Sequence, residues 1–197
     1  MDTEVKIDLQ CLKRIGEGSE KDFLHLYEKY KRNVYGLACK ILQTESLAEE
    51  ITQEVWMKVV QNAARFEDLH NSVSNNPVKA WILQITRNQC LNLLEKKSTG
   101  EVSSENEVEL LNEIPGASNS EEELAELQKE TLLSQWIDGL PEAQRVCLVL
   151  WISSEKSYRE LADELKLTET HVKVLIHRAK ENLKKQRQLC LKKGGLS

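Results

Sequence analysis

The chain has 197 residues, of which 40% are hydrophobic and 30% are charged, a composition that suits one large or two compact globular domains. No stretch approaches the roughly 20 apolar residues of a membrane-spanning helix, and the first residues lack the basic region and apolar run of a secretory signal. We therefore expect a cytoplasmic protein. The net charge of −5 argues at first sight against a polyanionic ligand.

The charge is distributed unevenly, however. Residues 98–130 contain ten Glu and one Lys, a local charge of −9, so the rest of the chain carries +4. Residues 171–197 contain eight Lys or Arg and a single Glu. Because phosphate binding needs a positive surface rather than a positive chain, the basic flanks restore nucleic acid as a candidate ligand.

The cysteines and the absent motifs exclude several classes of protein. The five cysteines are odd in number and widely spaced, without a C-x-x-C pair or metal-ligand spacing to a histidine. We expect reduced thiols, mostly in the core, and no metal site. Neither a glycine-rich phosphate loop nor a nucleophile arrangement occurs. We therefore expect no enzyme, no catalytic residues, no cofactor and no small-molecule substrate.

Helical spacing of apolar residues dominates the first hundred residues. A short helix is expected over about residues 9–15. Ser19 then caps a helix with the apolar face Phe23, Leu26, Tyr30, Val34, Leu37 and Ile41. Ser46 and Glu49 predict a capping box for a third helix, whose core face is Ala48, Ile51, Val55, Val59 and Ala63.

Two segments interrupt this helical pattern. Residues 67–76 are rich in Asn and Ser and predict a loop, after which Asn76 and Pro77 supply the N-cap and first turn of a helix reaching about Lys97. Residues 98–123 lack an apolar period and predict a linker that is flexible or orders only on binding. Helical pattern returns near Leu124.

The last third of the chain predicts a helix-turn-helix. The segment Gly139-Leu-Pro141 opens one helix, Ser157 and Glu160 predict a capping box for a short one, and Thr168 caps a longer basic helix after the turn Lys166-Leu167. The second helix of such a pair lies in a major groove. Basic residues off its buried stripe are available to DNA: His171, Lys173, His177, Arg178 and Lys180. The alternative is an ordinary pair of bundle helices with a solvated basic face.

Several segments, taken in order, carry a family resemblance. They are Leu12-Lys-Arg-Ile-Gly-Glu-Gly-Ser-Glu-Lys-Asp-Phe23, Leu26-Tyr-Glu-Lys-Tyr30, Leu47-Ala-Glu-Glu-Ile-Thr-Gln-Glu-Val-Trp-Met-Lys58, Ala80-Trp-Ile-Leu-Gln-Ile-Thr-Arg-Asn88, Leu140-Pro-Glu-Ala-Gln-Arg145, Tyr158-Arg-Glu-Leu-Ala162, His171-Val-Lys173 and His177-Arg-Ala179. Over about residues 9–97 and 124–187 the chain resembles the sigma factors of bacterial RNA polymerase, in their compact extracytoplasmic-function (ECF) group.

The resemblance implies an all-α fold of two small helical domains, residues 1–97 and 124–197, joined by the acidic linker 98–123. It implies a transcription initiation factor that binds core RNA polymerase at its clamp helices and flap, directs it to promoter DNA and helps to open it. An anti-sigma factor is a further implied partner. The linker would thread the polymerase cleft, where its charge could mimic a polyanion.

The resemblance also places roles on individual residues. Those matching the polymerase-docking face are Glu50, Gln53, Glu54 and Lys58. Those matching the capture and tracking of the melted minus-ten strand are Asn71, Ser72, Ser74, Asn75, Asn76, Lys79, Arg87, Asn88, Lys96 and Lys97. Those matching the minus-thirty-five reading helix are Thr170, His171, Lys173, Val174, His177 and Arg178.

Three departures from the family pattern keep other functions open. Lys166 replaces the usual turn glycine, Val174 and Leu175 stand where the family often has polar or basic residues, and the loop 67–76 lacks an aromatic residue. One alternative is a helix-turn-helix regulator that acts without polymerase. The other is a protein-only adaptor that retains the fold and has lost promoter reading, which predicts little salt-sensitive DNA affinity.

Overall fold

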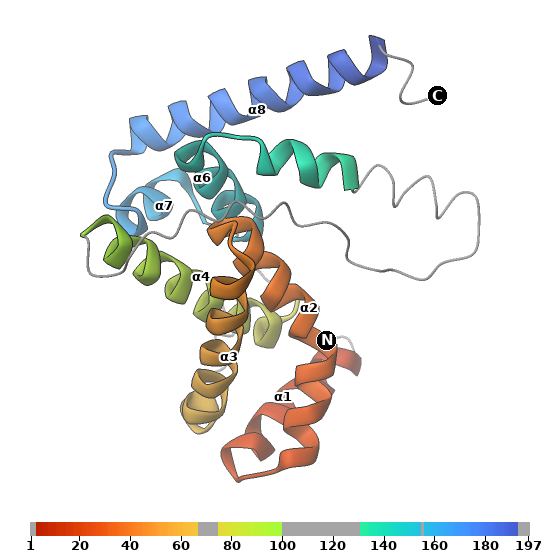
Figure 1. Cartoon of the computed structure of the whole chain (residues 1–197). Coiled ribbons are helices and arrows are strands. Elements are labelled where there is room, and N and C mark those ends of the chain that lie inside the picture. Colours follow the sequence, from red (N-terminus) through yellow and green to blue (C-terminus); the bar gives the residue numbers. More distant parts are fainter. Residues whose placement is uncertain (1–2, 67–74, 100–130, 155, 193–197) are drawn as a thin grey trace. The chain divides into compact units, whose positions relative to one another are not determined.

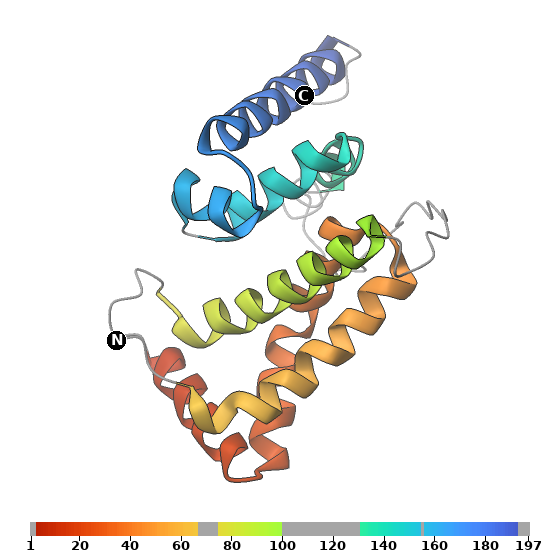
Figure 2. The ribbon, with the colours of Figure 1, turned by 90° about the vertical axis from the view of Figure 1, so that its left-hand side faces the viewer.

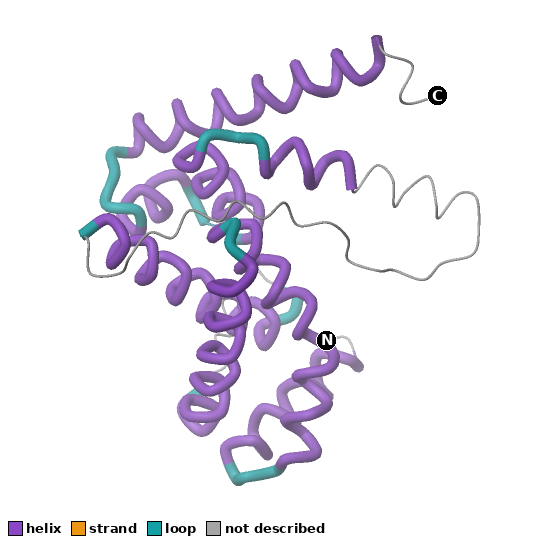
Figure 3. Tube along the Cα trace, in the orientation of Figure 1, coloured by secondary structure: helices purple, strands orange, loops and turns teal. Residues whose placement is uncertain are grey.

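A computed structural model describes residues 3–66, 75–99, 131–154 and 156–192. Every regular element in these ranges is a helix (Figure 3), which confirms the predicted all-α class. The chain divides into two compact units, residues 1–109 with 153–155 and residues 110–152 with 156–197, and each is described by itself. Most of the expected loop 67–76 and the linker from residue 100 onward lie outside the described residues. No helix within the described ranges is both long and apolar enough to cross a membrane.

The first unit is a bundle of four helices with one short 3-10 turn (Figure 1). Its elements are α1 (Thr3–Gly16), α2 (Glu20–Leu42), α3 (Glu45–Asn62), η1 (Ala63–Arg65) and α4 (Pro77–Ser98). Figure 2 shows α3 and α4 running side by side, in agreement with their contacts. The apolar faces predicted for α2 and α3 form the core, with full burial of Leu26, Val34, Ile41, Ala48, Val55 and Val59.

Two helix starts differ from the sequence prediction. The first helix begins at Thr3 rather than near residue 9. The additional turns bury Val5 and Asp8. Because Asp8 is charged, it interrupts the apolar spacing, and the sequence pattern therefore did not indicate these turns. The capping box at Ser46 is wrong: α3 starts one residue earlier, its N-cap is Thr44, and Thr44 makes no side-chain cap bond. The Thr44 hydroxyl donates instead to the Leu42 carbonyl, at 3.4 Å.

The caps predicted at Ser19 and Asn76 are confirmed. The Ser19 side chain accepts from the Asp22 amide, and the Asn76 side chain accepts from the Lys79 amide at 2.9 Å. Packing between α1 and η1 depends on Gly16, because a Cβ there would lie 2.8 Å from the Ala64 Cα. Any larger residue would push the two elements apart.

The second unit contains a helix over residues 131–138, followed by α6 (Glu142–Ser153), α7 (Tyr158–Glu164) and α8 (Glu169–Lys192). Side chains from all three labelled helices meet in its core, with full burial of Leu148, Leu150, Leu161, Val172 and Ala179. The capping box of Ser157 and Glu160 is present in both directions. The predicted cap at Thr168 is also confirmed, since its hydroxyl accepts from the His171 amide at 3.2 Å.

The turn between α7 and α8 closes tightly without a glycine. Lys166 has a backbone φ of 54°, in the left-handed region that residues other than glycine rarely adopt. Its amide donates to the Asp163 carbonyl at 3.3 Å, and the Leu167 amide donates to the Ala162 carbonyl at 2.9 Å. This pair of bonds is the Schellman motif that ends many helices. The backbone therefore keeps the expected turn and places the strain on Lys166.

The cysteines behave as the sequence predicts. All five thiols are free, and Cys11, Cys39, Cys90 and Cys147 are buried while Cys190 is half-buried. Burial raises the pKa of Cys90 to about 12. Burial also raises the pKa of Cys11 and of Cys147 to about 11. These three buried thiols are therefore protonated at neutral pH and pack as small apolar groups.

Candidate functional site

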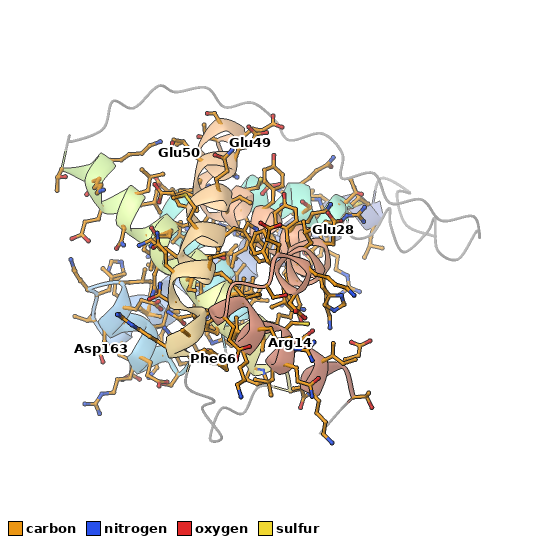
Figure 4. All side chains as sticks on the ribbon, turned by 90° about the horizontal axis from the view of Figure 1, so that it is seen from below. Arg14, Glu28, Glu49, Glu50, Phe66 and Asp163 are labelled. Atoms are coloured by element: carbon orange, nitrogen blue, oxygen red, sulfur yellow. The ribbon has the colours of Figure 1, made fainter. Side chains whose placement is uncertain are left out.

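The outward face of α3 presents the residues expected to dock on polymerase. Glu50, Gln53 and Glu54 are exposed, and Lys58 is half-buried. Figure 4 shows Glu49 and Glu50 in the first turns of α3, while Phe66 lies past its other end. The predicted residues divide between two hollows. Gln53 lines an apolar cavity of about 480 Å³ shared with α2, whereas Glu50, Glu54 and Lys58 line a groove of about 580 Å³ against α4.

Aromatic rings and two exposed aliphatic side chains form the apolar cavity. Trp56 packs edge-on against Phe23 and Tyr27, with ring centroids 6.0 and 5.2 Å apart. Met57 and Val60 complete the wall and are 61% and 45% exposed. Apolar side chains exposed beside a hollow mark a surface that a partner covers. The sequence shows Gln53 next to apolar residues but gives no indication of a cavity.

Trp56 carries a buried hydrogen-bond donor beneath this surface. The residue is only 4% exposed and therefore belongs mainly to the core. Its indole Nε1 is nevertheless buried with no hydrogen-bond partner in the part of the chain that the structure describes.

A third hollow, a polar pocket of about 320 Å³, lies between the end of α3 and the middle of α4. Its lining includes Lys58, Arg65, Trp81, Asn88 and Gln89. Phe66 holds the Trp81 ring edge-on at 5.2 Å. Asn88 was expected at the minus-ten strand, whereas Arg65 and Trp81 were not among the residues expected there. The available signal was helical spacing, since Trp81, four residues before Ile85 and seven before Asn88, shares their face of α4.

The remaining residues expected at the minus-ten strand are placed as follows. Asn71, Ser72 and Ser74 lie outside the described residues, and Asn75 is exposed. Exposed Lys96 and half-buried Lys79 and Lys97 lie at the two ends of α4. Arg87 is only 4% exposed and its Nη2 donates to the Gln84 Oε1 at 2.8 Å, so the expectation that it tracks the DNA backbone is wrong for this conformation. Gln84 also donates to the Asn88 Oδ1 at 2.8 Å.

Asn76 is the exception, because its side chain is committed to the protein. Its Nδ2 donates to the Asp8 Oδ2 and to the Tyr30 hydroxyl, both at 2.8 Å. Its Oδ1 caps α4 at the Lys79 amide. The residue therefore joins three helices at the point where the chain enters α4.

In the second unit, α8 presents the predicted promoter-reading residues to solvent. All six are exposed, namely Thr170, His171, Lys173, Val174, His177 and Arg178. Leu175 and Val174, which both depart from the family pattern, differ in their burial. Leu175 is 8% exposed and extends the core stripe, while Val174 is 40% exposed. Of the two, only Val174 therefore lies on the exposed face of α8.

Two aromatic rings contact two of the lysines of α8. The rings of Trp151 and Tyr158 stack at 6.0 Å and 7°. Lys180 lies 3.9 Å from the centre of the Trp151 ring, and Lys173 lies 5.9 Å from that of Tyr158. Lys173 also pairs with Glu169 at 2.6 Å, and its hydrogen bond lowers the pKa of that carboxyl. The basic helix is thus braced against α6 and α7.

These features define a helical protein with two modules. One is a bundle with an apolar cavity and a polar pocket, and the other is a helix-turn-helix with an exposed basic face. The sigma-70 region 2 family matches residues 26–99, and the sigma-70 region 4 family matches residues 122–183.

Relatives extend the match over most of the chain. The ECF RNA polymerase sigma factor SigW of Bacillus subtilis is 25% identical over 181 residues, covering 89% of this chain and 94% of its own. SigM of the same organism is 24% identical over 159 residues, covering 81% and 91%. SigK of Mycolicibacterium vanbaalenii is 21% identical over 154 residues, covering 78% and 76%.

The two regions together cover more than half of the chain. The chain belongs to the sigma-70 family, in its ECF group. It is a transcription initiation factor that directs RNA polymerase to promoters, as the resemblance predicted.

Proposed function

We propose that the face of α3 from Gln53 to Lys58 docks this factor on the clamp helices of core RNA polymerase. The observation that carries the proposal is the apolar cavity beside Gln53, where Met57 and Val60 are exposed. An apolar side chain of the enzyme would fill the cavity against the Trp56 ring. The polar residues at the rim would fix the orientation.

The melted minus-ten strand would lie over the polar pocket and the loop that precedes α4. An unpaired base needs a ring for stacking and groups that bond its edges. Trp81 supplies an aromatic ring that the loop itself lacks, and Asn88 and Gln89 supply amides. Lys58 and Arg65 add positive charge for the backbone.

The exposed half of α8 would read the minus-thirty-five element in a major groove, while the rest of the second module contacts the polymerase flap. Arg178 and His177 are the side chains best placed to meet phosphate or base edges, because both are exposed and off the core stripe. An anti-sigma factor that covers the α3 surface would exclude polymerase. The acidic linker would pass through the cleft of the enzyme.

The docking proposal is tested by binding to purified core polymerase. Replacing Gln53 and Glu54 by Ala removes rim contacts without touching the core, so helix content should persist while affinity falls. The matched control is Glu28→Ala on α2 (Figure 4), which removes an exposed carboxylate paired only with Lys31 in the described chain. Undiminished co-purification of the double variant would contradict the docking surface.

Promoter reading is tested by transcription from a fragment library with and without the factor, followed by mapping of start sites. On a fragment selected in this way, Arg178→Ala should lower affinity and reduce the salt dependence by about one phosphate contact. Arg187→Ala, an exposed cation near the end of the same helix, is the control and should leave the salt slope intact. An unchanged slope for Arg178→Ala would remove that residue from the interface.

A further inference from the structure

One lysine of α8 is held in place by an aromatic ring rather than by a carboxylate. The Lys180 Nζ lies 3.9 Å from the centre of the Trp151 ring, and that ring stacks on Tyr158 at 6.0 Å and 7°. The face of an indole attracts a cation, and Trp is the strongest aromatic residue in this role. Lys180 is nevertheless exposed, so its side chain stays accessible to a ligand.

The contact with a ring differs from an ion pair in its effect on charge. Lys173, seven residues earlier on α8, pairs with Glu169 at 2.6 Å, and that carboxylate offsets its positive charge. Lys180 has no carboxylate partner among the described residues. Because an indole is neutral, Trp151 restricts the motion of Lys180 without cancelling its charge. A cation that is ordered before it meets an anion loses less freedom on binding.

The position of Lys180 on α8 relates it to the proposed DNA-reading face. At 3.6 residues per turn, Lys173 and Lys180 form one row, about 10 Å apart along the axis, and Arg178 lies on the opposite flank, roughly 150° around the helix. A major groove about 12 Å wide fits a helix of about that diameter, so a sugar-phosphate strand borders each flank. The row that contains Lys180 would therefore face one strand and Arg178 the other.

We propose that Trp151 holds Lys180 in place as a phosphate contact beside the minus-thirty-five element. The inference rests on the proposed reading of DNA by α8. The N-terminal part of a recognition helix contacts base edges, so Lys180, further along the helix, meets the backbone instead. Trp151 belongs to α6 and is a positioning residue, because it acts on the DNA only through the lysine.

A double-mutant cycle in the reconstituted holoenzyme tests the pair on the promoter fragment selected by transcription. The variants are Trp151→Leu, Lys180→Ala and the two combined, and affinity is measured at several salt concentrations. Lys180→Ala should weaken binding roughly tenfold, as expected for one charge-assisted hydrogen bond, and lower the salt slope by about one phosphate contact. Trp151→Leu should weaken binding roughly threefold, the cost of ordering one lysine, with the slope unchanged because the charge remains. In the Lys180→Ala background, Trp151→Leu should have no further effect.

Two control variants separate positioning of the lysine from packing of the ring. Trp151→Phe keeps an aromatic ring and should retain most of the affinity. Arg187→Ala removes an exposed cation that contacts no ring in the described part of the chain, and it should leave the slope intact. The thermal midpoint reports on folding of each variant. Where Trp151→Leu lowers that midpoint markedly, Trp151→Met, whose flexible side chain adapts to the space, replaces it in the cycle.

The outcomes separate this inference from the function on which it rests. If Trp151→Leu weakens binding equally with and without Lys180, the ring only packs, and the inference is overturned. It is also overturned if Arg178→Ala lowers the salt slope and Lys180→Ala does not. If neither of these two variants changes affinity or slope, α8 does not contact DNA, and the proposed reading of the minus-thirty-five element fails as well. A Trp151→Leu effect that vanishes in the Lys180→Ala background and is small for Trp151→Phe supports the inference.

Discussion

Replacing Lys166 by Gly should stabilise the helix-turn-helix module. Lys166 has a φ of 54°, and a left-handed backbone costs a residue with a Cβ about 1–2 kcal/mol. Glycine removes this cost but gives the unfolded chain more freedom, which offsets about 0.4–1 kcal/mol. A net gain of about 0.5–1 kcal/mol remains. In a unit of this size it should raise the midpoint of thermal unfolding by roughly 3–6 °C.

The proper reference for this prediction is Lys166→Ala, which removes the side chain and keeps the Cβ. Calorimetry of the full-length protein would follow the unfolding transition of the second unit in both variants. Comparing Gly with Ala isolates the backbone effect from any interaction of the lysine side chain. If the Gly variant unfolds at or below the temperature of the Ala variant, the left-handed strain inferred at this turn is wrong.

Two further predictions concern titratable groups in the bundle. Burial raises the pKa of Asp8, but hydrogen bonds from Lys29, Tyr30 and Asn76 outweigh it, so the pKa is lowered overall. The ionised Asp8 contributes its full stabilisation above the pKa of about 3.9 that it has in the unfolded chain. This stabilisation is lost as the pH falls toward the lower pKa of the folded state. The urea midpoint should therefore fall less steeply between pH 5 and 3 for Asp8→Asn than for the wild type, and parallel curves would refute this. Cys190 should be the one thiol that reacts quickly with an aromatic disulfide in the native protein, because the other four are buried. Rapid reaction of a second thiol would contradict this burial.

Local signals allowed much of the fold to be predicted from sequence. The caps at Ser19, Ser157 and Thr168 form where a hydroxyl residue precedes a helical apolar stripe. Each cap bond reaches only three residues along the chain, so a short stretch of sequence is enough to predict the helix start. The failed cap at Ser46 shows the limit of such signals. Thr44 lies two residues earlier and also carries a hydroxyl group, and α3 begins directly after it although its side chain makes no cap bond.

The site was predictable only where it lies on one helix. Gln53 and Arg178 could be assigned to exposed faces because helical spacing alone determines which side of a helix a residue occupies. The cavity at Trp56 joins two helices, and the bond from Asn76 to Asp8 spans 68 positions of sequence. Contacts of that separation depend on tertiary packing, for which a single sequence carries no periodic signal.

The two apolar substitutions in the recognition helix bear differently on the adaptor alternative. Leu175 is buried and extends the stripe that packs against the rest of the module, so it strengthens the fold without altering the exposed face. Val174 stays exposed on the same face as Thr170 and His177, which lie one helical turn away on either side. An apolar group there suits a thymine methyl in the major groove. Because basic residues remain exposed beside it at Lys173 and Arg178, the helix keeps the charge that an adaptor without DNA affinity would not need.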